Sequence, residues 1–127
     1  MRPQLLMTPL AQYERVEWNG KNESGKTPIN DYVLILPDGA AEATAGKVLI
    51  PEPLRERHSM AAETGVLIAN GAGAWQWNSD RSRPYGGEAP QPGQRVCFER
   101  YAGATHHGKD GRMYRLMQDK CVSALDD

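Results

Sequence analysis

The segment from Gly20 to Thr27, with the sequence GKNESGKT, satisfies the phosphate-loop pattern G-x-x-x-x-G-K-[ST]. A working phosphate loop follows a buried strand and leads straight into a helix, whose N-terminal amides hold the phosphates. Here Pro28 is followed by an apolar, β-branched run that predicts a strand and not a helix. The preceding YERVEW is at best an edge strand. No apolar run ends in a carboxylate that offers a magnesium ligand. We therefore expect a flexible polar linker, and nucleotide binding through Lys26 and Thr27 is the lesser alternative.

Other residues capable of chemistry lack the spacing that their chemistry requires. The candidate metal ligands are His58, His106, His107, Cys97 and Cys121. No pair of them has the C-x₂₋₄-C or H-x₃₋₅-H spacing that places two ligands on one ion. Ser59 and Ser123 lie near His58 and Cys121, but neither occupies a G-x-S-x-G turn. The sequence predicts no catalytic residue, no metal site, no cofactor and two reduced cysteines.

Charge and hydropathy favour protein partners. The chain has 15 Lys and Arg against 16 Asp and Glu, so it lacks the basic footprint of a nucleic-acid or anionic-membrane binder. Trp75, Trp77 and Tyr85 could stack on single-stranded nucleic acid, but the neutral charge favours a hairpin tip that packs on neighbouring subunits. No apolar run approaches the ~20 residues of a membrane span, and LLMTPLA is too short for a signal peptide. We expect a cytoplasmic protein with neither nucleic-acid nor membrane partners.

The elements that must position any site are short strands. The runs DYVLIL, GVLIAN, RVCFE, RMYRLM and KCVSA are apolar or β-branched, and Gly/Pro turns such as GATHHGKDG separate them. No long helix, heptad or repeat is present. This pattern predicts an all-β fold, a small β-barrel, in a single domain. We expect a flexible N-terminal extension over residues 1–27 and the barrel domain over 28–127, with a long loop at about 39–62 and a hairpin at about 70–92.

Five segments in this order resemble the GroES or chaperonin-10 family from about Pro28 to Leu125. They are DYVLILPDG, AGKVLIPE, GVLIANGAG, PGQRVCFERYAG and RMYRLMQDKCVSAL. In that family a mobile loop carries an apolar triplet that docks on the chaperonin. The resemblance assigns chaperonin binding to Val48, Leu49 and Ile50. It assigns the flanks of the triplet to Gly46, Lys47, Pro51 and Glu52.

The resemblance implies a co-chaperonin that caps a GroEL-type chaperonin ring in a nucleotide-dependent way and encloses an unfolded client protein. ATP would be bound by the chaperonin and not by this chain. It also implies a homo-oligomeric ring, a heptamer, with Trp75, Trp77 and Tyr85 in a roof hairpin. We expect the first and last strands of neighbouring subunits to pair, which hides edges that would otherwise aggregate. The residues expected at this interface are Tyr32, Val33, Leu34, Cys121, Val122 and Ala124.

Several positions depart from the family pattern. Lys47 stands beside the triplet where a glycine is usual, Gln94 replaces an acid, and Ser123 occupies an apolar slot. The loop, the roof region and the N-terminus are also longer than usual. Such divergence resembles phage-encoded co-chaperonins that serve capsid proteins, for which the compartment is the bacterial host cytoplasm. Because a fold does not fix a function, a non-chaperonin structural or interaction module on the same barrel is the alternative.

Overall fold

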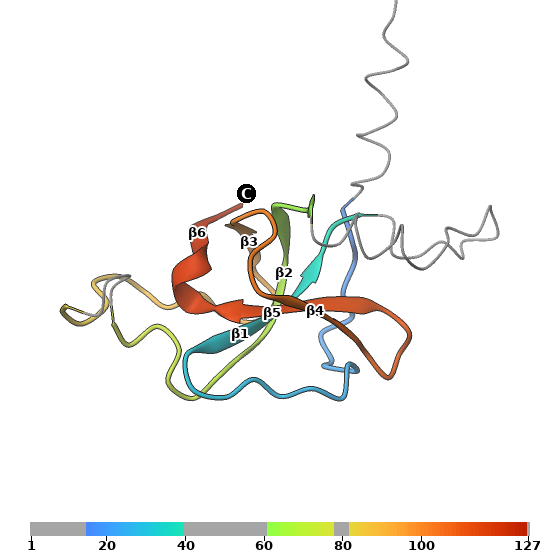
Figure 1. Ribbon diagram of the computed structural model, residues 1–127, viewed down its shortest axis with the longest axis horizontal. Coiled ribbons are helices and arrows are strands. Elements are labelled where there is room, and N and C mark those ends of the chain that lie inside the picture. Colours follow the sequence, from blue (N-terminus) through green and yellow to red (C-terminus); the bar gives the residue numbers. More distant parts are fainter. Residues whose placement is uncertain (1–14, 40–60, 78–81, 127) are drawn as a thin grey trace, which may run out of the picture.

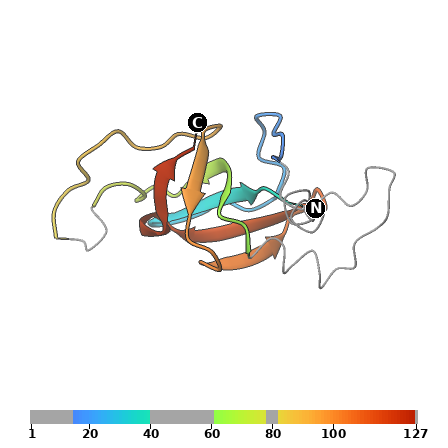
Figure 2. The same ribbon diagram turned by 90° about the horizontal axis from the view of Figure 1, so that it is seen from above.

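The computed structural model describes residues 15–39, 61–77 and 82–126, and these residues build one antiparallel sheet of six strands. The strands are β1 (Tyr32–Pro37), β2 (Thr64–Asn70), β3 (Arg95–Phe98), β4 (Ala104–His107), β5 (Met113–Gln118) and β6 (Val122–Leu125), with a short 3-10 helix, η1 (Asp119–Cys121), before the last strand. Their order across the sheet is β4-β5-β1-β2-β3-β6 (Figure 1). The sheet curls strongly into a small barrel (Figure 2), which confirms the all-β, GroES-like prediction.

Strand β4 lies where the sequence predicts only a turn. Ala104 to His107 pairs with β5, from Ala104 opposite Leu116 to His107 opposite Met113. β4 is an edge strand whose side chains are half-buried or exposed, so it carries no apolar run by which a sequence pattern would reveal it. The prediction of a turn over this segment is therefore wrong, because pairing and not burial creates the strand.

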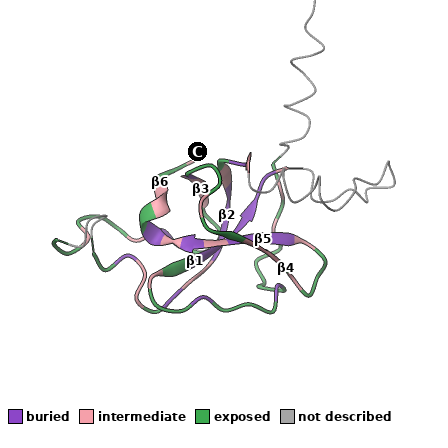
Figure 3. Ribbon diagram, in the orientation of Figure 1, coloured by how far each residue is buried: buried purple, intermediate pink, exposed green. Residues whose placement is uncertain are grey.

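Strand β1 is an inner strand of the sheet, with a neighbouring strand on each side. Both of its edges are paired, one with β2 and the other with β5. Val33 and Ile35 belong to one core cluster, whereas Leu34 and Leu36 belong to a second cluster on the opposite face. Because both faces are covered, the strand reads as a continuous apolar run rather than an alternating one. Figure 3 shows the buried positions concentrated along β1, β2 and β5.

Residues 15–27, which we call the N-terminal strap, cover the second cluster. Val16 and Trp18 pack against that cluster, and the backbone amide of Val16 donates a hydrogen bond to Asp38 (3.0 Å). The prediction of a flexible extension is therefore wrong for residues 15–27. The strap has no strand or helix period, so only its contacts with distant parts of the chain reveal that it belongs to the fold.

The hairpin between β4 and β5 holds the strap at two points. The side chain of Arg112 donates to the carbonyl oxygen of Glu17 (3.0 Å), and the amide of Lys109 donates to the carbonyl oxygen of Ser24 (2.9 Å). Ser24 is completely buried. The strap therefore connects the start of the β1–β2 connection to the β4–β5 hairpin.

Candidate functional site

The predicted chaperonin-binding triplet lies in the connection between β1 and β2. Val48, Leu49 and Ile50, with their flanks Gly46, Lys47, Pro51 and Glu52, fall within residues 40–60 and lie outside the described residues. The structure describes both ends of this connection. Since β1 and β2 are adjacent antiparallel strands, the chain leaves and re-enters the barrel at the same place, and the amide of Asp38 donates to the carbonyl oxygen of Thr64 (3.0 Å).

The carboxylate of Asp38 fixes the first end of the connection. Asp38 is 3% exposed, and its Oδ1 accepts hydrogen bonds from the amide of Val16 (3.0 Å) and from Nη1 of Arg95 (3.2 Å). Its Oδ2 accepts from the hydroxyl of Thr64 (2.5 Å) and from Nη2 of Arg95. The buried charge is thus paired and hydrogen-bonded, as a buried carboxylate requires.

Arg95 links this carboxylate to the C-terminal end of the described chain. Its Nε lies 3.5 Å from Oδ2 of Asp126. Burial by itself lowers the pKa of Arg95, but the hydrogen bonds and negative charges of Asp38 and Asp126 outweigh burial, so the pKa is raised above its usual value. Arg95 therefore remains a cation and holds three separate segments together.

Arg115, on β5, fixes the second end of the connection. Its Nη1 donates to the carbonyl oxygen of Ala62 (2.8 Å), and its Nη2 donates to the carbonyl oxygens of Ala102 (2.6 Å) and Glu99 (3.2 Å). Arg115 is completely buried, and this burial lowers its pKa to about 10. At neutral pH it is therefore protonated and able to donate all of these bonds.

The roof region, residues 70–92, is anchored by Trp75. The amide of Trp75 donates to the buried carboxylate of Asp119 (2.7 Å), and its indole N–H donates to the side-chain oxygen of Asn70 (3.0 Å). Its ring lies 5.9 Å from that of Tyr85, in a tilted arrangement. Trp77 is 48% exposed and forms an isolated bridge with Pro84. The structure therefore brings Trp75 and Tyr85 together and leaves Trp77 accessible.

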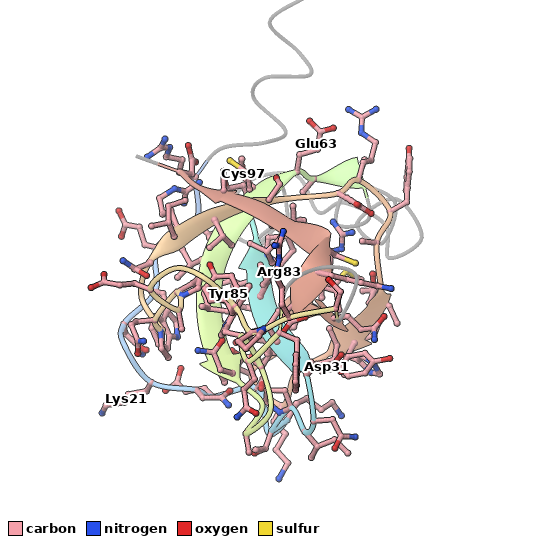
Figure 4. The ribbon with its side chains drawn as sticks, turned by 90° about the vertical axis from the view of Figure 1, so that its left-hand side faces the viewer. Lys21, Asp31, Glu63, Arg83, Tyr85 and Cys97 are labelled. Carbon is pink, nitrogen blue, oxygen red and sulfur yellow. The ribbon has the colours of Figure 1, made fainter. Side chains whose placement is uncertain are left out.

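A groove of about 400 Å³ lies between the roof region and β6, and its lining includes all three predicted roof aromatics. On the opposite wall are Lys120, Val122 and Leu125. Figure 4 looks onto this side of the molecule, with Arg83 and Tyr85 on the roof segment in front of the strands. The groove therefore lies beside the last strand of the sheet.

Only part of the predicted subunit interface is accessible in one chain. Tyr32 is 37% exposed, Cys121 and Val122 are half-buried, and Ala124 is exposed next to the outer edge of β6. Val33 and Leu34, by contrast, are fully buried core residues of a strand with no free edge. The prediction is corrected for these two residues, because β1 occupies the middle of the sheet and not its edge.

The phosphate-loop match forms a turn that satisfies its own polar groups. The Ser24 hydroxyl donates to the Asn22 side chain (2.6 Å) and accepts from the amide of Lys26 (3.0 Å), and the Asn22 amide group donates to the carbonyl oxygen of Lys26 (2.8 Å). After Thr27 the described chain continues into β1, with no helix between them. These amides are therefore arranged for a turn and not around a phosphate group.

The cysteine thiols are not arranged for reactive chemistry. Cys97 and Cys121 are free, and burial raises the pKa of each, so both favour the protonated thiol. Among residues 15–39, 61–77 and 82–126 there is no group of three potential metal ligands of the His, Cys, Asp and Glu types. Within the same residues, no helix has the length and apolar character needed to cross a membrane.

Known proteins resemble this chain over most of its described sequence. The sequence pattern of the chaperonin 10 Kd subunit family matches residues 26–125, which extend from the end of the strap to the end of β6. The 20 kDa chloroplastic chaperonin of Arabidopsis thaliana is 34% identical over 101 residues. That similarity covers 77% of this chain but only 36% of the plant protein. The barrel and the connection between Asp38 and Ala62 both fall within the family match, and this chain belongs to the chaperonin 10 kDa subunit family.

Proposed function

We propose that this chain is a co-chaperonin that caps a GroEL-type chaperonin ring in a nucleotide-dependent way and encloses an unfolded client protein. The observation that carries the proposal is the family match over residues 26–125, which includes the whole β1–β2 connection. The barrel holds both ends of that connection side by side, as a docking arm requires. Docking is assigned to Val48, Leu49 and Ile50, which are near the middle of the connection.

A single arm of this kind binds weakly. Burying each apolar residue of the triplet contributes roughly 1.5 to 3 kcal/mol, whereas ordering the backbone costs roughly 1 to 2 kcal/mol per residue. Several arms on one ring bind together, because each later contact is intramolecular. We therefore propose a homo-oligomeric ring, a heptamer, in which avidity supplies the affinity and weak arms permit release.

The ring contact is assigned to the outer edge of β6 and to accessible residues at and just before the start of β1. The outer edge of β6 pairs with no other strand of the described residues. The exposed side chains in these two places include Ile29, Tyr32 and Leu125, which are 66%, 37% and 53% exposed. Pairing between copies would cover apolar side chains and an open strand edge in the same step.

The nucleotide in this proposal belongs to the chaperonin, and the chain acts as a non-enzymatic partner without a cofactor of its own. We assign the protein to the cytoplasm. Its divergence from the family pattern supports a phage-encoded protein that acts in a bacterial host on a bulky client, such as a capsid protein. The supporting features are Lys47, Gln94 and Ser123 at positions that depart from the family pattern, together with the strap that precedes the family match.

Electron microscopy of the full chain mixed with a GroEL-type chaperonin tests the proposal. With ATP we expect caps of sevenfold symmetry on the chaperonin ends, and without nucleotide far fewer. The matched variant Leu49→Asp should form rings by native mass spectrometry but should not cap, because an unpaired carboxylate cannot enter an apolar groove. Capping by Leu49→Asp would move the docking site elsewhere. Absence of both rings and caps in the wild type would favour the structural-module alternative.

A further inference from the structure

Buried charge is concentrated at the ends of the long connections. In the part of the chain that the structure describes, the buried polar or charged residues are Ser24, Asp38, Arg115 and Asp119. Asp38 lies at the first end of the β1–β2 connection, Arg115 binds the second end at Ala62, and Asp119 binds the start of the roof region. Burying a charged group is costly unless it is fully paired. The placement of buried charges at the ends of the long connections therefore calls for a reason beyond stability.

We propose that Asp38 and Arg115 are positioning residues for chaperonin docking. Together they set the direction and separation in which the segment carrying Val48, Leu49 and Ile50 leaves the barrel. This role rests on the proposed function, since it concerns the same arm and adds the residues that aim it. Neither residue belongs to the docking triplet, and both act through the backbone at the ends of the connection.

At the first end, Asp38 adds directional bonds where strand pairing stops. The last pair in the β1–β2 ladder is Pro37 with Gly65, and Asp38 is the next residue. Its carboxylate then joins Thr64, Arg95 and Val16, which belong to β2, β3 and the strap. An apolar residue could fill this volume, but it could not hold three segments in a defined orientation. Hydrogen bonds are directional, whereas apolar contacts are not.

At the second end, the planar guanidinium group of Arg115 makes directional hydrogen bonds to backbone that lies outside the strands. It binds the carbonyl oxygens of Ala62, Glu99 and Ala102, none of which belongs to a strand. A guanidinium group presents its donors in a rigid plane, whereas a lysine ammonium group is a single flexible point. The arm is therefore fixed to β5 at its second end and to β3 at its first.

Positioning matters because the arms act together. If loosening the ends halves the effective concentration of each arm at its groove, seven arms lose roughly a hundredfold in combined affinity. A loss this large arises without any change in the triplet itself. Positioning residues should therefore change chaperonin affinity far more than they change the amount of folded ring.

The test measures affinity of the ring for a GroEL-type chaperonin with ATP, well below the unfolding temperature of each variant. Asp38→Asn and Arg115→Lys keep the approximate size of each side chain but disrupt its bonds, and we expect affinity to fall roughly tenfold or more. Thr64→Val removes only the bond to Asp38, and we expect a loss of roughly threefold or more. Native mass spectrometry should show intact rings for each.

A control variant makes the readout specific. Arg100→Gln removes an exposed ion pair with Glu63 (3.5 Å) beside the second end, and it should bind the chaperonin like the wild type. A purely structural role for Thr64 would instead lower the stability of the Thr64→Val ring without lowering the chaperonin affinity of folded rings.

Folded rings of Thr64→Val and Arg115→Lys that bind like the wild type would overturn the positioning role. If Arg115→Lys fails to fold, Thr64→Val decides the outcome by itself. Full binding by Leu49→Asp would instead overturn the assignment of the docking triplet. A wild-type ring that binds no chaperonin would overturn the proposed function, and the positioning role with it.

Discussion

The guanidinium carbon of Arg115 lies 4.9 Å from the centroid of the Phe98 ring, inside the barrel. Arg115 is completely buried and Phe98 is 4% exposed. A cation over an aromatic face is stabilised most when both are removed from water. The pair therefore contributes to the stability of the barrel as well as to the position of Ala62.

A double-mutant cycle measures the contact between Arg115 and Phe98. Phe98→Leu should lower the free energy of unfolding in urea by about 2 kcal/mol, because it removes the aromatic face and leaves the site incompletely filled. Arg115→Met should lower it by roughly 2 to 4 kcal/mol, because it removes the hydrogen bonds to three carbonyl oxygens, of which the bond to Ala62 is fully buried. We expect a coupling energy of about 1 kcal/mol or more between the two changes. A coupling near zero would show that the ring contact contributes nothing beyond packing.

Tyr114 should make the protein less stable in alkali. Burial raises the pKa of Tyr114 above its usual value of 10, and the hydrogen bond that its hydroxyl donates to Asp110 raises it further. Above pH 10 the unfolded chain loses this proton while the folded chain keeps it, so the stabilisation present below pH 10 declines as the pH rises. The stability advantage of the wild type over Tyr114→Phe should therefore shrink above about pH 10.

Urea unfolding between neutral pH and alkaline pH measures this difference, and phenolate absorbance reports the titration of the five tyrosines. Tyr101→Phe changes an exposed ring and is the control. Arg115, whose pKa is lowered to about 10 by burial, is present in all of these variants. Comparing variants at each pH removes this common contribution. A constant difference between wild type and Tyr114→Phe would contradict the prediction.

The strap should contribute to stability through one aromatic residue. Trp18 packs on the second core cluster, and its indole N–H donates to the carbonyl oxygen of Lys21 (2.7 Å). Trp18→Ala should lower the free energy of unfolding by about 1 to 2 kcal/mol, because it uncovers apolar surface on the sheet. Glu17→Ala alters the exposed neighbour and keeps the carbonyl oxygen that binds Arg112, so it should unfold like the wild type. Equal effects of the two changes would contradict a covering role for the strap.

The outer edge of β6 should determine whether rings form. The amide of Asp126 donates to the carbonyl oxygen of Arg95 on β3, so alternation along the strand points the amide of Leu125 toward the outer edge. Leu125→Pro should give folded monomers, because proline cannot donate a bond to a neighbouring strand. Leu125→Thr keeps the amide and should keep the ring. Native mass spectrometry distinguishes the two, and intact Leu125→Pro rings would show that copies meet elsewhere.

The sequence by itself determines most of the strands. The runs around Val33, Val66 and Met117 are rich in apolar residues between turn residues, and this local signal predicts β1, β2 and β5 without knowledge of their partners. The ordered segments also identify the family, which the comparison confirms over residues 26–125. The assignment of Val48, Leu49 and Ile50 to docking stays a prediction, since these residues lie outside the described ones.

Only the tertiary structure reveals the features that depend on contacts between residues far apart in the sequence. Edge strand β4 carries no apolar run, and the strap carries no period, so neither has a local signal. The two positioning residues depend on partners far along the chain: Asp38 is 57 positions from Arg95, and Arg115 is 53 positions from Ala62. The predicted strands follow from short apolar runs between turn residues, whereas these bonds depend on which strands lie side by side. A single sequence does not contain that order explicitly, and folding establishes it through the burial of the shared core.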